Sequence, residues 1–257
     1  MFLDGLRRGD LGVNVPRVLS IAGSDSSGGA GIQADLKTFA ALNVYGMTAV
    51  TAVTAQNTRR VVAIHVVPTS LVTDQIDAVT DDIGVDAVKI GMLANAEIVE
   101  AVTAAITRHA FENVVVDPVM IATSGDALLD DDAFDVMKIR LFPKALIVTP
   151  NIPEAEALSG VKIGDADSLR QAARIIRETG PAHVLIKGGH ATGPKVVDVL
   201  FDGCAFQEFS SERIDSGNMH GTGCRLSAAI AAFLARGLGV IEAVDAGINY
   251  VRESILH

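Results

Sequence analysis

Short runs of apolar residues alternate along the chain with longer segments in which apolar positions recur with a helical period. Most of the short runs are apolar at every position, which is typical of strands that are covered on both faces. The predicted strands cover residues 17–22, 48–55, 86–90, 113–117, 145–149, 183–187 and 196–201. The predicted helices cover residues 31–43, 69–83, 95–109, 130–141, 153–159, 167–179, 221–236 and 240–255.

This alternation predicts a mainly parallel sheet with helices on both faces. Residues 57–66 fit a hairpin-like flap better than a helix. No linker or low-complexity segment interrupts the chain, so we expect residues 17–257 to form a single α/β domain and residues 1–16 to be a flexible extension. Ligands of such folds bind beyond the carboxyl ends of the strands, and the loops that follow the strands are therefore the candidates for chemistry.

Composition narrows the class of protein. The chain has 257 residues, of which 49% are hydrophobic, so it can bury a large core. Its net charge of −10 argues against a nucleic-acid binder, because phosphate backbones require clustered Lys and Arg. Two cysteines, Cys204 and Cys224, are too few for a disulfide framework or a zinc cluster.

The sequence also bears on membranes. Residues 1–16 lack the apolar segment of a secretion signal. Residues 38–58 carry no formal charge, but they include five Thr and several other polar residues, so they predict a helix end followed by a buried strand. We therefore expect a cytoplasmic protein without a membrane span.

Two glycine-containing loops could bind anions. The loop GSDSSGGAG (residues 23–31) opens into a helix and lets a ligand approach the backbone, although a plain turn capped by Ser or Asp explains it too. In HGTGC (residues 220–224), consecutive amides would lie at the positive end of a helix, where a phosphoryl group could bind. The same field would lower the pKa of the Cys224 thiol. Alternatively, Cys224 is simply a small buried apolar side chain.

Charged side chains follow three of the strands. Asp117 and Glu154 could help to hold Mg²⁺, or could be ordinary turn and helix caps. Lys187 leads into Gly188 and Gly189 and could reach a phosphate, although a solvated strand end is the simpler reading.

Two further residues suit a flat ring. The amide of Gln56 could pair with the edge of an aminopyrimidine, and Met92 could pack on the ring. The simpler alternatives are a polar strand end for Gln56 and core filling for Met92.

Taken together, these segments resemble the ribokinase-like superfamily, and within it the hydroxymethylpyrimidine kinases/phosphomethylpyrimidine kinases of thiamine biosynthesis. The resembling segments occur in the same order in this chain: AGSDSSGGAGIQADLKTF (22–39), TAVTAQNT (51–58), KIGML (89–93), VVVDPVM (114–120), SGDALL (124–129), VTPNIPEA (148–155), IKGGH (186–190) and HGTGCRLSAAIAA (220–232). The resemblance implies a three-layer α/β/α sandwich with a mainly parallel central sheet. It also implies ATP-dependent phosphorylation of 4-amino-5-hydroxymethyl-2-methylpyrimidine and then of its monophosphate.

The resemblance also implies roles for single residues. Cys224 would be the catalytic base, and Gly221, Thr222 and Gly223 would complete an anion hole with it. The remaining assignments are Asp117 and Glu154 for Mg²⁺, Lys187, Asn151 and Gly189 for ATP, and Gln56, Ala30, Asp35, Met92 and Val119 for the pyrimidine. Asp35 could instead be a structural partner within its helix.

A pyridoxine/pyridoxal kinase of the same superfamily is the main alternative, and a catalytically silent regulator is a weaker one. Gln56 favours the pyrimidine, because pyridine substrates lack the 4-amino group. Relatives are commonly dimers, so we expect a homodimer.

The chain departs from the family pattern in three places. Arg225 and Met219 stand where Thr is common, and Arg225 could either add charge near the phosphates or point to solvent. The family usually continues past the last helix, whereas this sequence stops at His257, so either the sequence is shortened or this member lacks that segment.

Overall fold

The fold is described from a computed structural model for residues 15–120, 130–190, 195–214 and 221–256. These segments contain one nine-stranded sheet, in the spatial order β3-β2-β1-β4-β5-β6-β7-β8-β9. The strands are β1 (Arg17–Asp25), β2 (Tyr45–Gln56), β3 (Val61–Val66), β4 (Ala87–Ile90), β5 (Val114–Val116), β6 (Ile147–Val148), β7 (His183–Ile186), β8 (Lys195–Phe201) and β9 (Phe206–Glu212). The six strands from β2 to β7 in the sheet run parallel, and β3, β8 and β9 are antiparallel to their neighbours.

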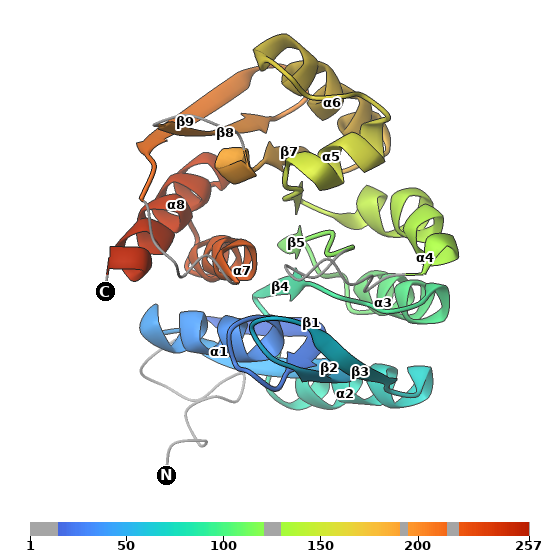
Figure 1. The fold of residues 1–257 in the computed structure, drawn as a ribbon. Helices are drawn as coiled ribbons and strands as arrows, with labels where there is room; N and C mark the ends of the chain where they lie inside the picture. Colours follow the sequence, from blue (N-terminus) through green and yellow to red (C-terminus); the bar gives the residue numbers. More distant parts are fainter. Residues whose placement is uncertain (1–14, 121–129, 191–194, 215–220, 257) are drawn as a thin grey trace.

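Helices cover both faces of the sheet (Figure 1). They are α1 (Gly31–Ala41), α2 (Thr69–Asp82), α3 (Ala96–Arg108), α4 (Asp131–Val136), α5 (Ile152–Ser159), α6 (Ala166–Glu178), α7 (Thr222–Ala235) and α8 (Val240–Leu256). One hydrophobic core joins the sheet to α2, α3, α4, α5 and α6, and a second joins its other face to α1, α7 and α8. The three-layer sandwich with a mainly parallel sheet is therefore confirmed.

Almost every predicted element is present. The segment 57–66 contains β3, which forms the predicted hairpin by pairing antiparallel with β2. Two predictions were incomplete: β9 was not predicted, and the helix predicted over residues 130–141 is α4 followed by the wider π-type turn Met137–Leu141.

Some of the predicted segments lie wholly or partly outside the described residues. The flexible extension falls almost wholly on residues 1–14, which lie outside the described residues, as do the SGDALL segment and Met219. The single domain over residues 17–257 stays a prediction, which the one continuous sheet supports. Residues 38–58 contain the end of α1 and then β2, as expected, and none of the described helices is long and apolar enough to cross a membrane.

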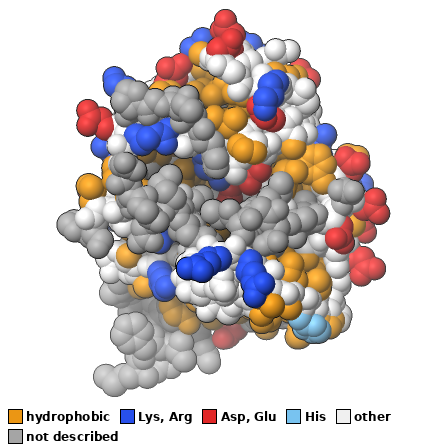
Figure 2. Space-filling view, in the orientation of Figure 1, with side chains coloured by type: hydrophobic (Ala, Val, Ile, Leu, Met, Phe, Trp, Pro, Cys, Tyr) orange, Lys and Arg blue, Asp and Glu red, His pale blue; other side chains and the backbone are white. Residues whose placement is uncertain are grey.

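Charge is spread over the visible surface rather than concentrated. In Figure 2, the coloured basic side chains form separate groups among acidic and apolar ones, instead of one continuous basic face. This agrees with the net charge of −10, and the expectation that the chain does not bind nucleic acids stays a prediction.

Candidate active site

A cavity of about 570 Å³, here called the central cavity, lies beyond the carboxyl ends of the parallel strands. It is bordered by the end of β2, by the segments after β1, β4, β5, β6 and β7, and by α7 and α8. With the exception of Asp35, every residue that the sequence suggested for the site lines this cavity: Ala30, Gln56, Met92, Asp117, Val119, Asn151, Glu154, Lys187, Gly189, Gly221, Thr222, Gly223 and Cys224.

The loop between β1 and α1 is shaped by Asp25, whose role the sequence did not reveal. Its carboxylate accepts hydrogen bonds from the amides of Ser27 (2.8 Å), Gly29 (3.1 Å) and Ala30 (2.8 Å). Gln33 holds the other side of the loop, because its Oε1 accepts from the Asp25 amide and its Nε2 donates to Ser24. The loop therefore has a fixed shape before any ligand binds.

The start of α7 packs directly on this loop. Gly221 has a φ of +76°, and a Cβ added there would lie 1.9 Å from the carbonyl oxygen of Gly29, so only glycine fits. A Cβ added at Gly223 would lie 3.2 Å from Nζ of Lys187, so the first turn of α7 adjoins that ammonium group. The positive end of the helix and a lysine thus face the same space, which suits an anion.

Cys224 lies in this first turn and is half-buried. Burial raises the pKa of its thiol, and the positive charge of Lys89 and a backbone hydrogen bond from Gly31 oppose that rise only in part. The direction is opposite to the lowering expected at a helix start, because desolvation and the nearby carboxylates of Asp117 and Asp35 raise the pKa more than Lys89 and the Gly31 amide lower it.

Asp117 and Lys187 form a buried ion pair beside α7. Nζ of Lys187 donates to Oδ1 of Asp117 at 2.7 Å, while Ser227 and Thr149 donate to the same carboxylate at 3.3 Å. Burial alone would raise the pKa of Asp117, but Lys187 holds it below its ordinary value. Asp117 is therefore ionised at neutral pH and balances the ammonium group.

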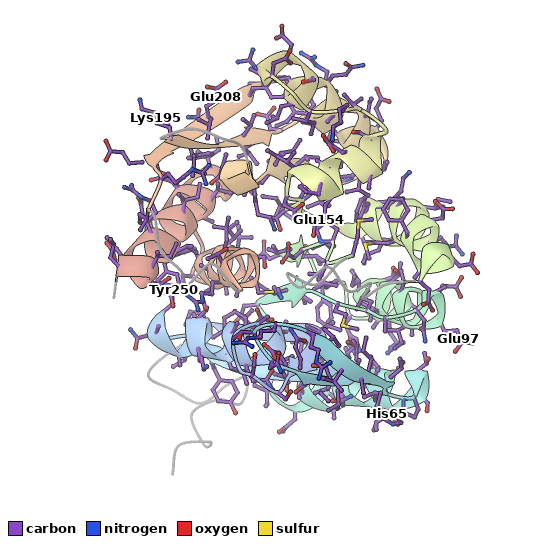
Figure 3. All side chains as sticks on the ribbon, in the orientation of Figure 1. His65, Glu97, Glu154, Lys195, Glu208 and Tyr250 are labelled. Carbon is purple, nitrogen blue, oxygen red and sulfur yellow. The ribbon has the colours of Figure 1, made fainter. Side chains whose placement is uncertain are left out.

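Glu154 and Asn151 begin α5 with a reciprocal capping box. Asn151 Oδ1 accepts from the Glu154 amide at 2.9 Å, and Glu154 Oε2 accepts from the Asn151 amide at 2.8 Å. Figure 3 shows Glu154 below α5 on the side that faces the centre of the molecule. Burial raises the pKa of Glu154 to about 7, although Lys187 opposes the rise.

A magnesium ion would fit these carboxylates only with help from a ligand. Among the described residues, no three His, Cys, Asp or Glu side chains gather closely enough to hold a metal ion by themselves. However, Mg²⁺ is usually held by one or two carboxylates together with phosphates and water. Asp117 and Glu154 both line the cavity and influence each other's charge, so the donor set suits such an ion.

Asp35 lies under the cavity rather than in its wall. Its Oδ2 accepts hydrogen bonds from Ser20 (2.6 Å) and from Nζ of Lys89 (2.9 Å), and it has no exposed surface. The alternative role as a structural partner agrees with this geometry better than contact with a substrate does.

Lys89 lines the cavity floor, and the sequence analysis assigned it no role. Burial would lower its pKa, but the carboxylate of Asp35 raises it above its ordinary value, so Lys89 carries a positive charge. A signal was present: a lysine within the apolar strand AVKI cannot be buried without a partner. Asp198 in β8 is a comparable omission, since it is buried, lines the cavity and accepts from the Gly188 amide at 2.7 Å.

Another part of the cavity lining is apolar. Met92 and Val119 belong to a small cluster with Ala52 and Ala94, and Gln56 lies beside it at the end of β2. Oε1 of Gln56 accepts from the Thr54 hydroxyl at 3.2 Å. A flat ring between these side chains would meet one amide and several apolar atoms.

Arg225 does not line the central cavity. It borders a separate cavity of about 180 Å³, here called the side cavity, together with Lys37, Tyr250 and Ser254. Tyr250 is labelled in Figure 3, near α8 and α1. The interpretation that Arg225 adds charge near the phosphates in the central cavity is therefore not supported.

Comparison with known proteins gives a consistent result. The family model described as phosphomethylpyrimidine kinase matches residues 25–257. The chain is 53% identical over 238 residues to the thiamine biosynthesis bifunctional protein ThiED of Geobacter sulfurreducens, a match that covers 93% of this chain but only 49% of that protein.

Solved structures show the same relationship. The phosphomethylpyrimidine kinase of Clostridium difficile has a TM-score of 0.83 and 43% identity, and the match covers 94% of this chain and 100% of that one. The pyridoxal kinase of Staphylococcus aureus, in complex with AMP-PCP and pyridoxal, has a TM-score of 0.86 and 37% identity, covering 95% of this chain and 88% of that one. With the family model matching nearly the whole length, the chain belongs to the phosphomethylpyrimidine kinase family.

Proposed function

We propose that this kinase transfers phosphate from ATP to 4-amino-5-hydroxymethyl-2-methylpyrimidine and then to its monophosphate. The observation that carries the proposal is a single cavity lined both by Gln56 with an apolar cluster and by Lys187 with the start of α7. This arrangement supports a site for a flat, polar ring and a site for phosphates within one cavity. The resemblance of residues 22–232 to the family supplies the identity of the substrate.

In this proposal, Gly221 to Cys224 bind the phosphoryl group in transfer, and Lys187 with Asn151 and Gly189 binds the phosphates of ATP. The ion pair of Lys187 with Asp117 holds the ammonium group near the start of α7 before ATP arrives. Asp117 and Glu154 would hold Mg²⁺, which neutralises phosphate charge when bound.

Cys224 takes the proton of the substrate hydroxyl. Because phosphoryl transfer proceeds through a loose transition state, that proton is lost late and a weak base suffices. The raised pKa of the thiol means that the fraction of thiolate grows only above neutral pH. Catalysis at neutral pH therefore depends mainly on positioning and on the positive charges around the phosphates.

Gln56, Ala30, Met92 and Val119 bind the pyrimidine in this proposal. The Gln56 amide can accept from the exocyclic amine and donate to the adjacent ring nitrogen. A pyridoxal kinase activity is the second candidate, because a pyridoxal kinase is among the structures most similar to this one. Gln56 favours the pyrimidine, since a pyridine substrate offers no 4-amino group to it.

Counting ADP release separates these activities. The purified protein is mixed with ATP, Mg²⁺ and a limiting amount of the aminopyrimidine, its monophosphate or pyridoxal. The proposal predicts two ADP per aminopyrimidine and one per monophosphate. One ADP per pyridoxal without turnover of the pyrimidines would identify a vitamin-B6 kinase instead, and no ADP in any arm would leave only a binding protein.

A homodimer in the cytoplasm completes the proposal. Exposed apolar side chains on the β2–β3 hairpin, among them Val53, Val62 and Ile64, support an interface between two copies. Sedimentation equilibrium at micromolar concentration would distinguish the dimer from a monomer.

A further inference from the structure

The part of the central cavity between α8 and the β8–β9 hairpin has no role in binding the pyrimidine or the phosphates. Ile248, Val251 and Ile255 of α8 line it on one side. Val196 and Ile214 line it as well, and Leu226 of α7 lies beside α8, because a Cβ added at Gly247 would be 3.3 Å from it. The α8 side of this region is therefore a mainly apolar slot, while Ser211, Glu212 and Arg213 at the end of β9 add polar and charged side chains to the lining.

Arg252 is the charged residue that α8 contributes to this region, which Asp198, Glu212 and Arg213 also line. It lines the cavity from α8, and its Nε is buried with no hydrogen-bond partner among the described residues. Leaving a buried donor unpaired destabilises a folded protein, so such atoms commonly mark a place where a ligand supplies the acceptor. The guanidinium is also planar and stacks well on flat aromatic systems.

The neighbours of Arg252 leave it directed at the cavity rather than elsewhere. Tyr250 and Ser254, on the same helix, line the side cavity, whereas Ile248, Val251 and Ile255 line the central cavity with Arg252. One face of α8 thus meets α1, and another carries an apolar stripe interrupted by one unsatisfied cation.

From this arrangement we infer that Arg252 binds the nucleoside part of the phosphate donor and determines how tightly the nucleotide is held. The inference rests on the proposed function, in which the phosphates occupy the space between Lys187 and the start of α7. A nucleotide so placed has its base and ribose in the apolar slot, and a ring nitrogen or ribose oxygen then accepts from Nε. The apolar side chains contact the faces of the base.

The test compares Arg252→Met with the wild-type protein by calorimetric titration of ADP and, separately, of tripolyphosphate. Methionine keeps an unbranched apolar stem and removes the donors. Arg252→Met should weaken ADP binding about tenfold, the effect of losing one charge-assisted hydrogen bond, and leave tripolyphosphate binding within twofold. Arg236→Ala, at an exposed arginine outside the cavity lining, is the matched control and should change neither.

Other outcomes overturn the inference. If Arg252→Met binds ADP as tightly as the wild type, Arg252 does not contact the nucleotide. If it loses tripolyphosphate as strongly as ADP, the residue binds phosphate and not the nucleoside. Thermal unfolding without ligand checks the fold, and it should show no loss of stability, because the removed donor has no partner. A wild-type protein that binds ADP but phosphorylates no pyrimidine would refute the proposed substrate and leave the role of Arg252 intact.

Discussion

The buried carboxyl of Glu154 predicts a particular pH dependence of folding stability. Its pKa rises from an ordinary 4.5 to about 7 because the group is desolvated at the start of α5. A carboxyl with a higher pKa in the folded chain takes up a proton on folding. Its contribution to stability is therefore fully present below about pH 4.5 and is lost as the pH rises through about 7.

Glu154→Gln removes this titration while keeping a side chain that can accept from the Asn151 amide. A rise of this size corresponds to about 3 kcal/mol in the free energy of unfolding, since each pKa unit is worth about 1.4 kcal/mol. The stability of the wild type relative to Glu154→Gln should therefore fall by about 3 kcal/mol as the pH rises from below 5 to 8. Urea unfolding of both proteins at several pH values, followed by circular dichroism, measures the difference while the titrations common to both cancel.

The neighbouring Glu156 offers a matched control on the same helix. It is half-buried rather than buried, and hydrogen bonds from Lys162 and the Ile163 amide lower its pKa. Stability from a lowered pKa is present above the unfolded value of about 4.5 and is lost only in acid, so Glu156→Gln should give a flat difference from pH 5 to 8. A flat difference for Glu154→Gln as well would refute the reasoning, because Glu154 would then titrate as an ordinary carboxyl.

Three further predictions test the site. Cys224→Ala should lower kcat at least about 100-fold and leave the Kd of the aminopyrimidine within a few-fold. The wild-type rate should rise above neutral pH, whereas the residual rate of the variant should not. Normal turnover by the variant would exclude the base role. Lys89→Met should lower the free energy of unfolding by about 3–5 kcal/mol, because it leaves the buried carboxylate of Asp35 without its cation. The double variant with Asp35→Asn should regain most of that stability. Equal losses in the single and double variants, measured by urea unfolding, would show that the pair is not coupled. Gln56→Leu should raise the KM of the aminopyrimidine about tenfold and leave that of pyridoxal nearly unchanged, measured by coupled ADP release, and equal effects on both would remove Gln56 from substrate selection.

The sequence predicted the layers of this fold well, because parallel strands covered on both faces must be apolar throughout. The strand that was missed, β9, reads FQEFSSE and has no such pattern. Its polar residues lie at the edge of the sheet, where solvent reaches them, and the strand exists because it pairs with β8 over its whole length. Such pairing between segments cannot be recognised from one segment alone.

The site was predictable to the extent that it follows from topology. Loops after parallel strands converge at one edge of the sheet, so residues as distant in sequence as Gln56 and Cys224 could be expected to line one cavity. The electrostatic pairs were not predictable in this way. Lys89 pairs with Asp35 across 54 positions, and the burial that raises the pKa of Cys224 depends on how α7 packs. These properties arise from three-dimensional neighbours that no local pattern encodes.

The two ion pairs at the cavity, Lys89 with Asp35 and Lys187 with Asp117, are charged groups that the fold keeps buried at a cost in stability. Lys89 with Asp35 and Lys187 with Asp117 are nearly inaccessible to solvent, and a buried ion pair is often no more stable than an apolar replacement of similar volume. Three ionisable groups in the wall of one cavity and a fourth beneath it are therefore poorly explained by stability. They are well explained by phosphate binding, because a cation in a site of low dielectric attracts phosphate strongly, and its carboxylate keeps it charged until the phosphate arrives. The same groups that the sequence pattern could not pair are thus the ones that suit a phosphate in this cavity.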